Sequence, residues 1–203
     1  MTDAARDALD ALADAVSLWR ITPAASKDVI DAATDALVAG LDSPSLGILA
    51  GEPATATTYE LEALVDDTMR ELGLAHVVDG DAERAALAAM LRRLTAGRIG
   101  PRELAAWAHA RLGHGGHADA QPFVHLDDVY YVWADEGHDL GQLDRWTYDE
   151  AEAFLAGRPS PGHADGWLAG PLMVDPPPRP VRRTRLARLV RRLAPPRPPR
   201  RRS

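Results

Sequence analysis

The sequence predicts an all-α protein, a bundle of about six helices with short loops, followed by a disordered or partly helical basic C-terminal tail. Apolar residues recur at intervals of three and four residues in several segments, which is the periodicity of amphipathic helices. Most of these segments end at Gly, and many begin at Ser, Thr or Asp, as helices do. No alternating apolar pattern is long enough to build a sheet, so no strand is expected.

The first predicted helices follow directly from these start and stop residues. The opening segment carries four apolar residues at helical spacing: Leu9, Leu12, Val16 and Trp19. Thr22 is a natural N-cap for the next helix, because a proline follows it at the first helical position, and Gly40 ends that helix. A short helix is then expected after Ser43, ending at Gly51.

Two capping boxes mark further helix starts. Thr57 is followed three residues later by Glu60, and Thr147 is followed in the same way by Glu150. In a capping box the hydroxyl and the carboxylate each accept a hydrogen bond from the other residue's backbone N–H. The sequence therefore predicts one helix starting just after residue 57 and another starting just after residue 147.

Three more helices are expected between the two capping boxes. Glycine and proline residues at their ends place them at about 81–97, at 101–113 and from Pro122 onward. The centre of the third, residues 129–133, is rich in residues that favour strands. A helix remains the prediction there, because the apolar residues keep helical spacing.

The chain divides into three predicted regions. A break at Asp79-Gly80 separates an N-terminal helical subdomain, residues 1–78, from a C-terminal helical subdomain, residues 79–175, that packs on it. A Pro- and Arg-rich basic tail, residues 176–203, follows them.

The net charge of −7 conceals a strong asymmetry along the chain. The tail from residue 176 holds 11 Arg and no acidic residue. Residues 1–175 hold 12 Lys and Arg against 30 Asp and Glu, a net charge of −18. Such a body is repelled by nucleic acid and anionic lipid, whereas the tail is attracted to both.

Several function classes find no support in the composition and motifs. The chain has no cysteine, which excludes disulfides, thiolate metal sites and cysteine nucleophiles. It contains no Walker A loop, no G-x-S-x-G elbow and no H-E-x-x-H pair, so we predict no catalytic residue and no cofactor. The acidic N-terminus lacks the apolar core of a signal peptide, and no apolar run spans a bilayer, which favours a cytoplasmic protein.

Aromatic and acidic residues gather between residues 126 and 150. Tyr and Trp are frequent interface anchors, and carboxylates attract a basic partner. The candidate partner-binding residues are Asp127, Asp128, Tyr131, Asp135, Glu136 and Trp146. The alternative is that the aromatic residues belong to the core of a helix pair and the acids face solvent.

A histidine-rich stretch precedes this segment. Imidazole and carboxylate groups together suit a transition metal, and the candidate ligands are His114, His117 and His125. A metal-dependent enzyme centred on residues 109–128 is therefore one alternative function. The other interpretation is a solvated polar loop whose histidines are unrelated.

The tail contains a basic amphipathic pattern. Leu186, Leu189, Val190 and Leu193 share one helical face. The remaining faces carry six candidate anion-binding residues: Arg182, Arg183, Arg185, Arg188, Arg191 and Arg192. Such a helix suits an adaptor that binds an anionic membrane or nucleic acid, and a disordered tail is the alternative.

Two stretches resemble known groups. The run D-A-A-T-D-A-L-V-A-G-L-D-S-P-S-L-G-I-L-A-G, residues 31–51, with E-L-G-L at 71–74, resembles small uncharacterised actinobacterial helical proteins. The run L-T-A-G-R-I-G-P-R-E-L-A-A-W-A, residues 94–108, with the aromatic-acidic segment 126–136, is similar to the second half of colicin-D-type immunity proteins. This second resemblance implies a helical, non-catalytic inhibitor whose acidic face binds a basic, tRNA-cleaving toxin domain.

Overall fold

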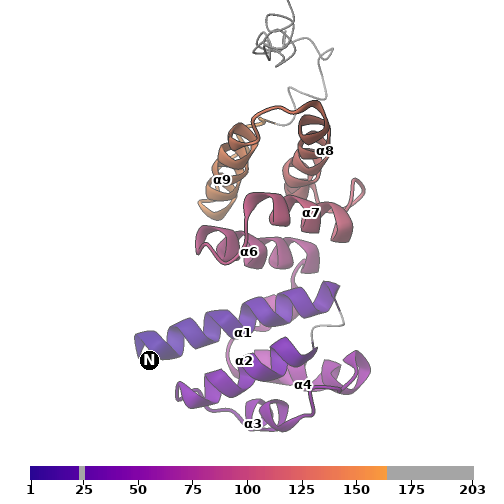
Figure 1. Cartoon of the computed structure of the whole chain (residues 1–203). Helices are drawn as coiled ribbons and strands as arrows, with labels where there is room; N and C mark the ends of the chain where they lie inside the picture. Colours follow the sequence, from indigo (N-terminus) through magenta and orange to yellow (C-terminus); the bar gives the residue numbers. More distant parts are fainter. Residues whose placement is uncertain (23–25, 164–203) are drawn as a thin grey trace, which may run out of the picture. The chain divides into compact units, whose positions relative to one another are not determined.

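A computed structural model describes residues 1–22 and 26–163, and these residues are all helical or loop, which confirms the all-α prediction (Figure 1). The first five helices are α1 (Asp3–Ile21), α2 (Ser26–Val38), α3 (Pro44–Gly51), α4 (Thr58–Glu71) and α5 (Ala75–Asp79). The next four are α6 (Ala82–Thr95), α7 (Pro101–Arg111), α8 (Gln121–Glu136) and α9 (Gly141–Leu155), with a 3₁₀ turn η2 (Ala118–Ala120) before α8. The described ranges thus contain nine α-helices, and the prediction of about six was too low.

The helix α1 connects the two groups of helices. It packs against α2 on one side and against α6 on the other, as Figure 1 shows. The short helix α3 lies between α2 and α4, while α7 packs on α8, and α9 contacts both α6 and α8. A single helix therefore contributes to the packing of both groups.

The buried apolar side chains form two clusters. The N-terminal cluster draws on α1 to α5, with Leu12, Trp19, Val29, Leu61 and Met69 among its members. The C-terminal cluster draws on α6 to α9, with Leu87, Leu91, Leu104, Phe123 and Tyr130 among its members. Adjacent residues of α1 belong to different clusters, since Trp19 lies in the first and Leu18 in the second. The described residues nevertheless belong to one compact unit, and the boundary at residue 79 stays a prediction.

One of the two predicted capping boxes is present. The Thr57 hydroxyl accepts from the Glu60 N–H, and the Glu60 carboxylate accepts from the Thr57 N–H at 2.7 Å. The other prediction was wrong, because α9 begins at Gly141, six residues before Thr147, and Thr147 is buried inside it. The Thr147 hydroxyl donates to the Leu143 carbonyl at 2.9 Å, which is how a threonine within a helix satisfies its side chain.

The segment rich in strand-forming residues is helical. In α8 the residues Val129, Tyr130 and Trp133 are buried on one face, and they pack in the C-terminal cluster. Tertiary packing of an apolar helical face outweighs the weak intrinsic preference of β-branched and aromatic residues for strands.

Two further sequence predictions concern the basic tail and membrane-spanning segments. The six tail arginines, Arg182 to Arg192, lie outside the described residues. Among residues 1–22 and 26–163, no helix is both long and apolar enough to cross a membrane.

Candidate functional site

The helix α8 presents two contrasting faces. Pro122 occupies its first turn, and Gly137, in the left-handed conformation with φ 75°, ends it. Phe123, Leu126 and Tyr130 point into the C-terminal cluster and are almost completely buried. Residues three or four positions apart share a helical face, so Asp128, Tyr131 and Asp135 lie together on the opposite side.

This outward face is acidic and carries exposed apolar surface. We call it the α8 acidic face, defined by Asp127, Asp128, Tyr131, Val132, Asp135 and Glu136. Tyr131 is 76% exposed and Val132 is 41% exposed. The helix has four carboxylates and no Lys or Arg. Five of the six predicted partner-binding residues therefore lie on α8, and Asp128, Tyr131 and Asp135 share one side of it.

The sixth, Trp146, belongs to a different group. Its ring lies 6.1 Å from the Trp133 ring and stacks on the His163 ring at 5.4 Å with an interplanar angle of 7°. It is partly buried against the C-terminal cluster. Trp146 therefore helps to pack α9. This agrees with the alternative interpretation, in which the aromatic residues belong to the core of a helix pair.

Tyr130, next to the exposed Tyr131, links α8 to α9. Its hydroxyl donates to the Asp144 carboxylate at 2.7 Å and lies 3.3 Å from the Thr147 hydroxyl on α9. Burial raises the pKa of the Tyr130 hydroxyl, with a smaller contribution from the neighbouring Asp144 carboxylate. This contact ties α8 to α9, and the burial of Phe123 and Leu126 on the same side of α8 leaves the other side facing outward.

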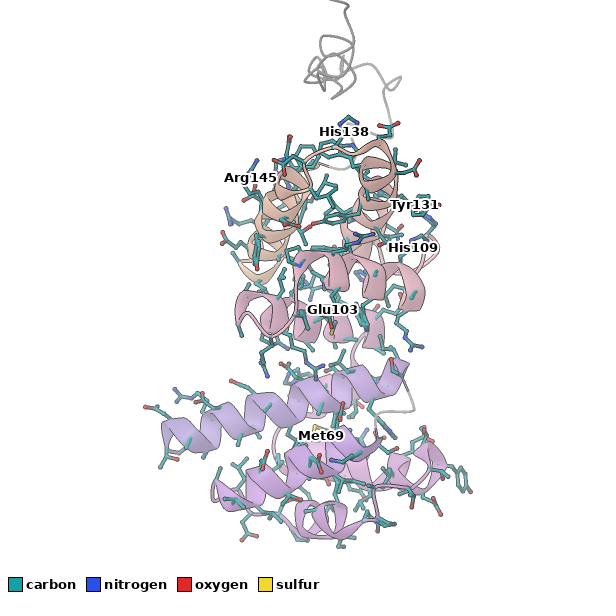
Figure 2. The ribbon with its side chains drawn as sticks, in the orientation of Figure 1. Met69, Glu103, His109, Tyr131, His138 and Arg145 are labelled. Carbon is teal, nitrogen blue, oxygen red and sulfur yellow. The ribbon has the colours of Figure 1, made fainter. Side chains whose placement is uncertain are left out.

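Histidines meet carboxylates at one end of the α8 acidic face. His109, in the last turn of α7, places Nδ1 2.9 Å from Asp127 Oδ2 and 3.7 Å from Asp128 Oδ1. His114, in the following loop, places Nε2 3.5 Å from Asp128 Oδ2. Figure 2 shows His109 and Tyr131 on the same side of the view, at α7 and α8. We call the group of His109, His114 and Asp128 the His–Asp cluster.

The fold keeps two of the three histidines predicted as metal ligands together and places the third elsewhere. His125 stacks on His114 with ring centroids 5.9 Å apart, and its buried Nδ1 has no hydrogen-bond partner among the described residues. His117 lies elsewhere, with Asp81 and Asp119 each 3.8 Å from its ring nitrogens. The structure thus keeps His114 and His125 close together, removes His117 and adds His109.

The loop that carries His114 is held by side chains on both sides. Gln121 donates its amide to the Gly113 carbonyl at 3.1 Å and to the Gly116 carbonyl at 3.2 Å. Glu83 on α6 accepts from the His117 N–H at 2.6 Å. A Cβ atom at Gly116 would lie 2.5 Å from the Leu112 carbonyl oxygen, so the loop needs glycine there.

A separate cleft of about 420 Å³ lies between α1 and the α5–α6 region. Small side chains line much of it, among them Ala13, Ser17 and Ala85. Its buried carboxylate, Asp14, accepts from Arg92 Nε at 3.0 Å, and Arg92 also lines the cleft. The two opposite charges in this cleft are therefore paired with each other.

Sequence reasoning could not assign the partners of His109. The residue lies 18 positions before Asp127, and only the packing of α7 on α8 brings their side chains together. The density of His and Asp over residues 109–128 was the available signal, and it located the region without selecting the ligands.

The chain was compared with protein-family models, with curated proteins and with solved structures. No family model, curated protein or solved structure matches it. The structural features that bear on function are therefore the α8 acidic face and the His–Asp cluster.

Proposed function

We propose that the protein is a non-catalytic binding module that holds a basic protein partner on the α8 acidic face. The observation that carries this proposal is Tyr131, a large aromatic side chain that is 76% exposed among carboxylates on a helix without Lys or Arg. Exposed tyrosines surrounded by a polar rim are frequent energetic centres of protein interfaces. The rigid attachment of α8 through Tyr130 and Asp144 pre-organises this face.

Charge selects the kind of partner. Residues 1–175 carry a net charge of −18, so a basic protein is steered toward the body and an anionic one is repelled. The partner class that we propose is a basic nuclease of the toxin type, in keeping with the resemblance to colicin-D-type immunity proteins. In this role the protein inhibits the nuclease by occupying its nucleic-acid-binding surface.

A capture experiment with matched variants tests this function. Immobilised full-length protein is exposed to extract of the native cells at low and at high salt, and the bound proteins are identified. We expect a basic protein to be retained at low salt. The substitution Tyr131→Ala should weaken its binding by about thirty-fold in Kd, which corresponds to about 2 kcal/mol at a hot spot. The wild-type protein should also inhibit any RNA cleavage by the captured partner.

The control is Tyr59→Ala. Tyr59, on α4, is 89% exposed and therefore offers an equally accessible tyrosine away from α8. Retention of the same partner by Tyr59→Ala supports the assignment to α8. If no basic protein is captured, or if Tyr131→Ala retains it as well as the wild type does, the proposal is wrong.

A further inference from the structure

The His–Asp cluster has the composition of a metal site. Two imidazoles and a carboxylate converge there, and one ligand atom from each of His109, His114 and Asp128 lies within 4.8 Å of the others. Neighbouring ligand atoms in a tetrahedral zinc site, with bonds of about 2.0–2.1 Å, lie about 3.3 Å apart. His109 Nδ1 lies 3.7 Å from Asp128 Oδ1, and His114 Nε2 lies 3.5 Å from Asp128 Oδ2, so each imidazole is close to this distance from one oxygen of the carboxylate.

The surroundings of the cluster support the same interpretation. Asp127 Oδ2 lies 2.9 Å from His109 Nδ1, so a second carboxylate stands at the same ring nitrogen that faces Asp128. Gln121 and Glu83 hold the loop that presents His114. His125 adds a third imidazole beside His114, and its buried Nδ1 lacks a partner among the described residues.

We propose that His109, His114 and Asp128 bind one divalent transition-metal ion of the zinc type. Mixed imidazole and carboxylate ligands suit Zn²⁺ and its neighbours, whereas Mg²⁺ and Ca²⁺ prefer oxygen ligands alone. Asp127, which faces the same nitrogen of His109, offers the ion a further carboxylate oxygen, and His117 is not a ligand. The ion links the end of α7, the loop after it and α8, and it lies beside the α8 acidic face.

Titration of the full-length, untagged, chelator-treated protein with Zn²⁺ alone tests the site. Isothermal titration calorimetry should give one ion per chain, with weaker binding at acid pH because protons compete for the imidazole nitrogens. We expect His114→Ala and Asp128→Asn each to weaken binding by more than about tenfold, since loss even of an outer partner costs about 10–100-fold. A large excess of Mg²⁺ should not displace Zn²⁺.

Two histidine controls make the test specific. His76→Ala removes a histidine on α5, and His117→Ala removes the loop histidine that the structure places with Asp81 and Asp119. Both variants should bind Zn²⁺ as the wild type does. Equal weakening by His117→Ala and His114→Ala would overturn the assignment, as would an absence of saturable binding.

Thermal unfolding separates loss of the ion from loss of the fold. The His114 side chain is 57% exposed, so His114→Ala should leave Tm unchanged in chelator. Zn²⁺ should raise Tm of the wild type but not of His114→Ala, because an ion that binds only the folded state stabilises it. A rise of equal size in both proteins contradicts the site. Tyr131→Ala should bind Zn²⁺ normally, so failure of the metal site and failure of the partner face are distinguishable.

Discussion

Individual residues at the His-bearing loop show how close contact, rather than local preference, selects an amino acid. Gly115 and Gly116 are adjacent in sequence, yet only Gly116 lies against backbone, 2.5 Å from the Leu112 carbonyl oxygen when a Cβ is added. A Cβ at Gly115 meets nothing within 4 Å. The two glycines therefore have different roles, although the H-G-G-H sequence presents them identically.

This difference gives a residue-scale prediction. Gly116→Ala forces the backbone of the loop away from Leu112, and we expect the free energy of unfolding to fall by about 1–3 kcal/mol, as overpacked sites show. Urea denaturation measures the change. Gly115→Ala is the matched control and should be neutral or slightly stabilising, because it only restricts the unfolded chain. Equal destabilisation by both substitutions contradicts the close contact as its cause.

Among the helices, α3 and α4 are joined by one carboxylate. Glu71, the last residue of α4, accepts from the Ser45 N–H at 2.9 Å and from the Ser45 hydroxyl at 2.8 Å. Ser45 lies in the first turn of α3, where backbone N–H groups lack partners within the helix. The carboxylate satisfies one of these donors from a distant part of the chain.

The Glu71 contact predicts a pH dependence. The Ser45 N–H and hydroxyl hold the pKa of Glu71 below its usual value of 4.5. A carboxyl group with a lowered folded-state pKa stabilises the fold above its unfolded pKa, and this contribution is lost as the pH falls through the folded pKa. We expect Glu71→Gln to lower Tm at neutral pH, with the difference from wild type shrinking below about pH 4.5. Thermal unfolding at several pH values measures this.

A second carboxylate on the same helix provides the control. Asp67 is exposed on α4, and the structure shows no described residue paired with it. Asp67→Asn should therefore change Tm little and without a comparable pH trend. A Tm difference for Glu71→Gln that stays constant from neutral to acid pH would count against the Ser45 contact.

At the scale of the whole molecule, α1 couples the two buried clusters. It contacts both α2 and α6, and its adjacent residues Leu18 and Trp19 are buried in different clusters. The Asp14–Arg92 ion pair adds a polar link between α1 and α6. Destabilising one group of helices should therefore weaken the other through α1.

Hydrogen exchange on a core variant tests this coupling. Leu91 on α6 is completely buried, so Leu91→Ala should reduce the free energy of unfolding by about 2–5 kcal/mol. We expect faster amide exchange in α2 to α4 as well as in α6 to α9, because cooperative units share exchange behaviour. Ile48→Ala on α3, at a position 57% exposed, is the control and should have little effect. Acceleration confined to α6 to α9 contradicts the coupling.

Local signals in the sequence determined the secondary structure well. Apolar periodicity, glycine stops and the Thr57–Glu60 capping box act over a few residues, so the all-α class could be predicted from them. The Thr147–Glu150 spacing predicted a helix start that is not there, because the same two residues also fit inside a helix. There the Thr147 hydroxyl donates to the Leu143 carbonyl. A short motif therefore located a helix here without locating its start.

The sequence by itself determined the helical class, the charge asymmetry and the region of interest around residues 109–136. Only the tertiary structure decided which side chains meet: it joined His109 to Asp127, separated His117 from His114, and packed Trp146 against Trp133. The physical reason is the sequence distance over which the interactions act. Helix formation depends on neighbours within about four positions, whereas the site depends on how α7, the loop after it and α8 pack.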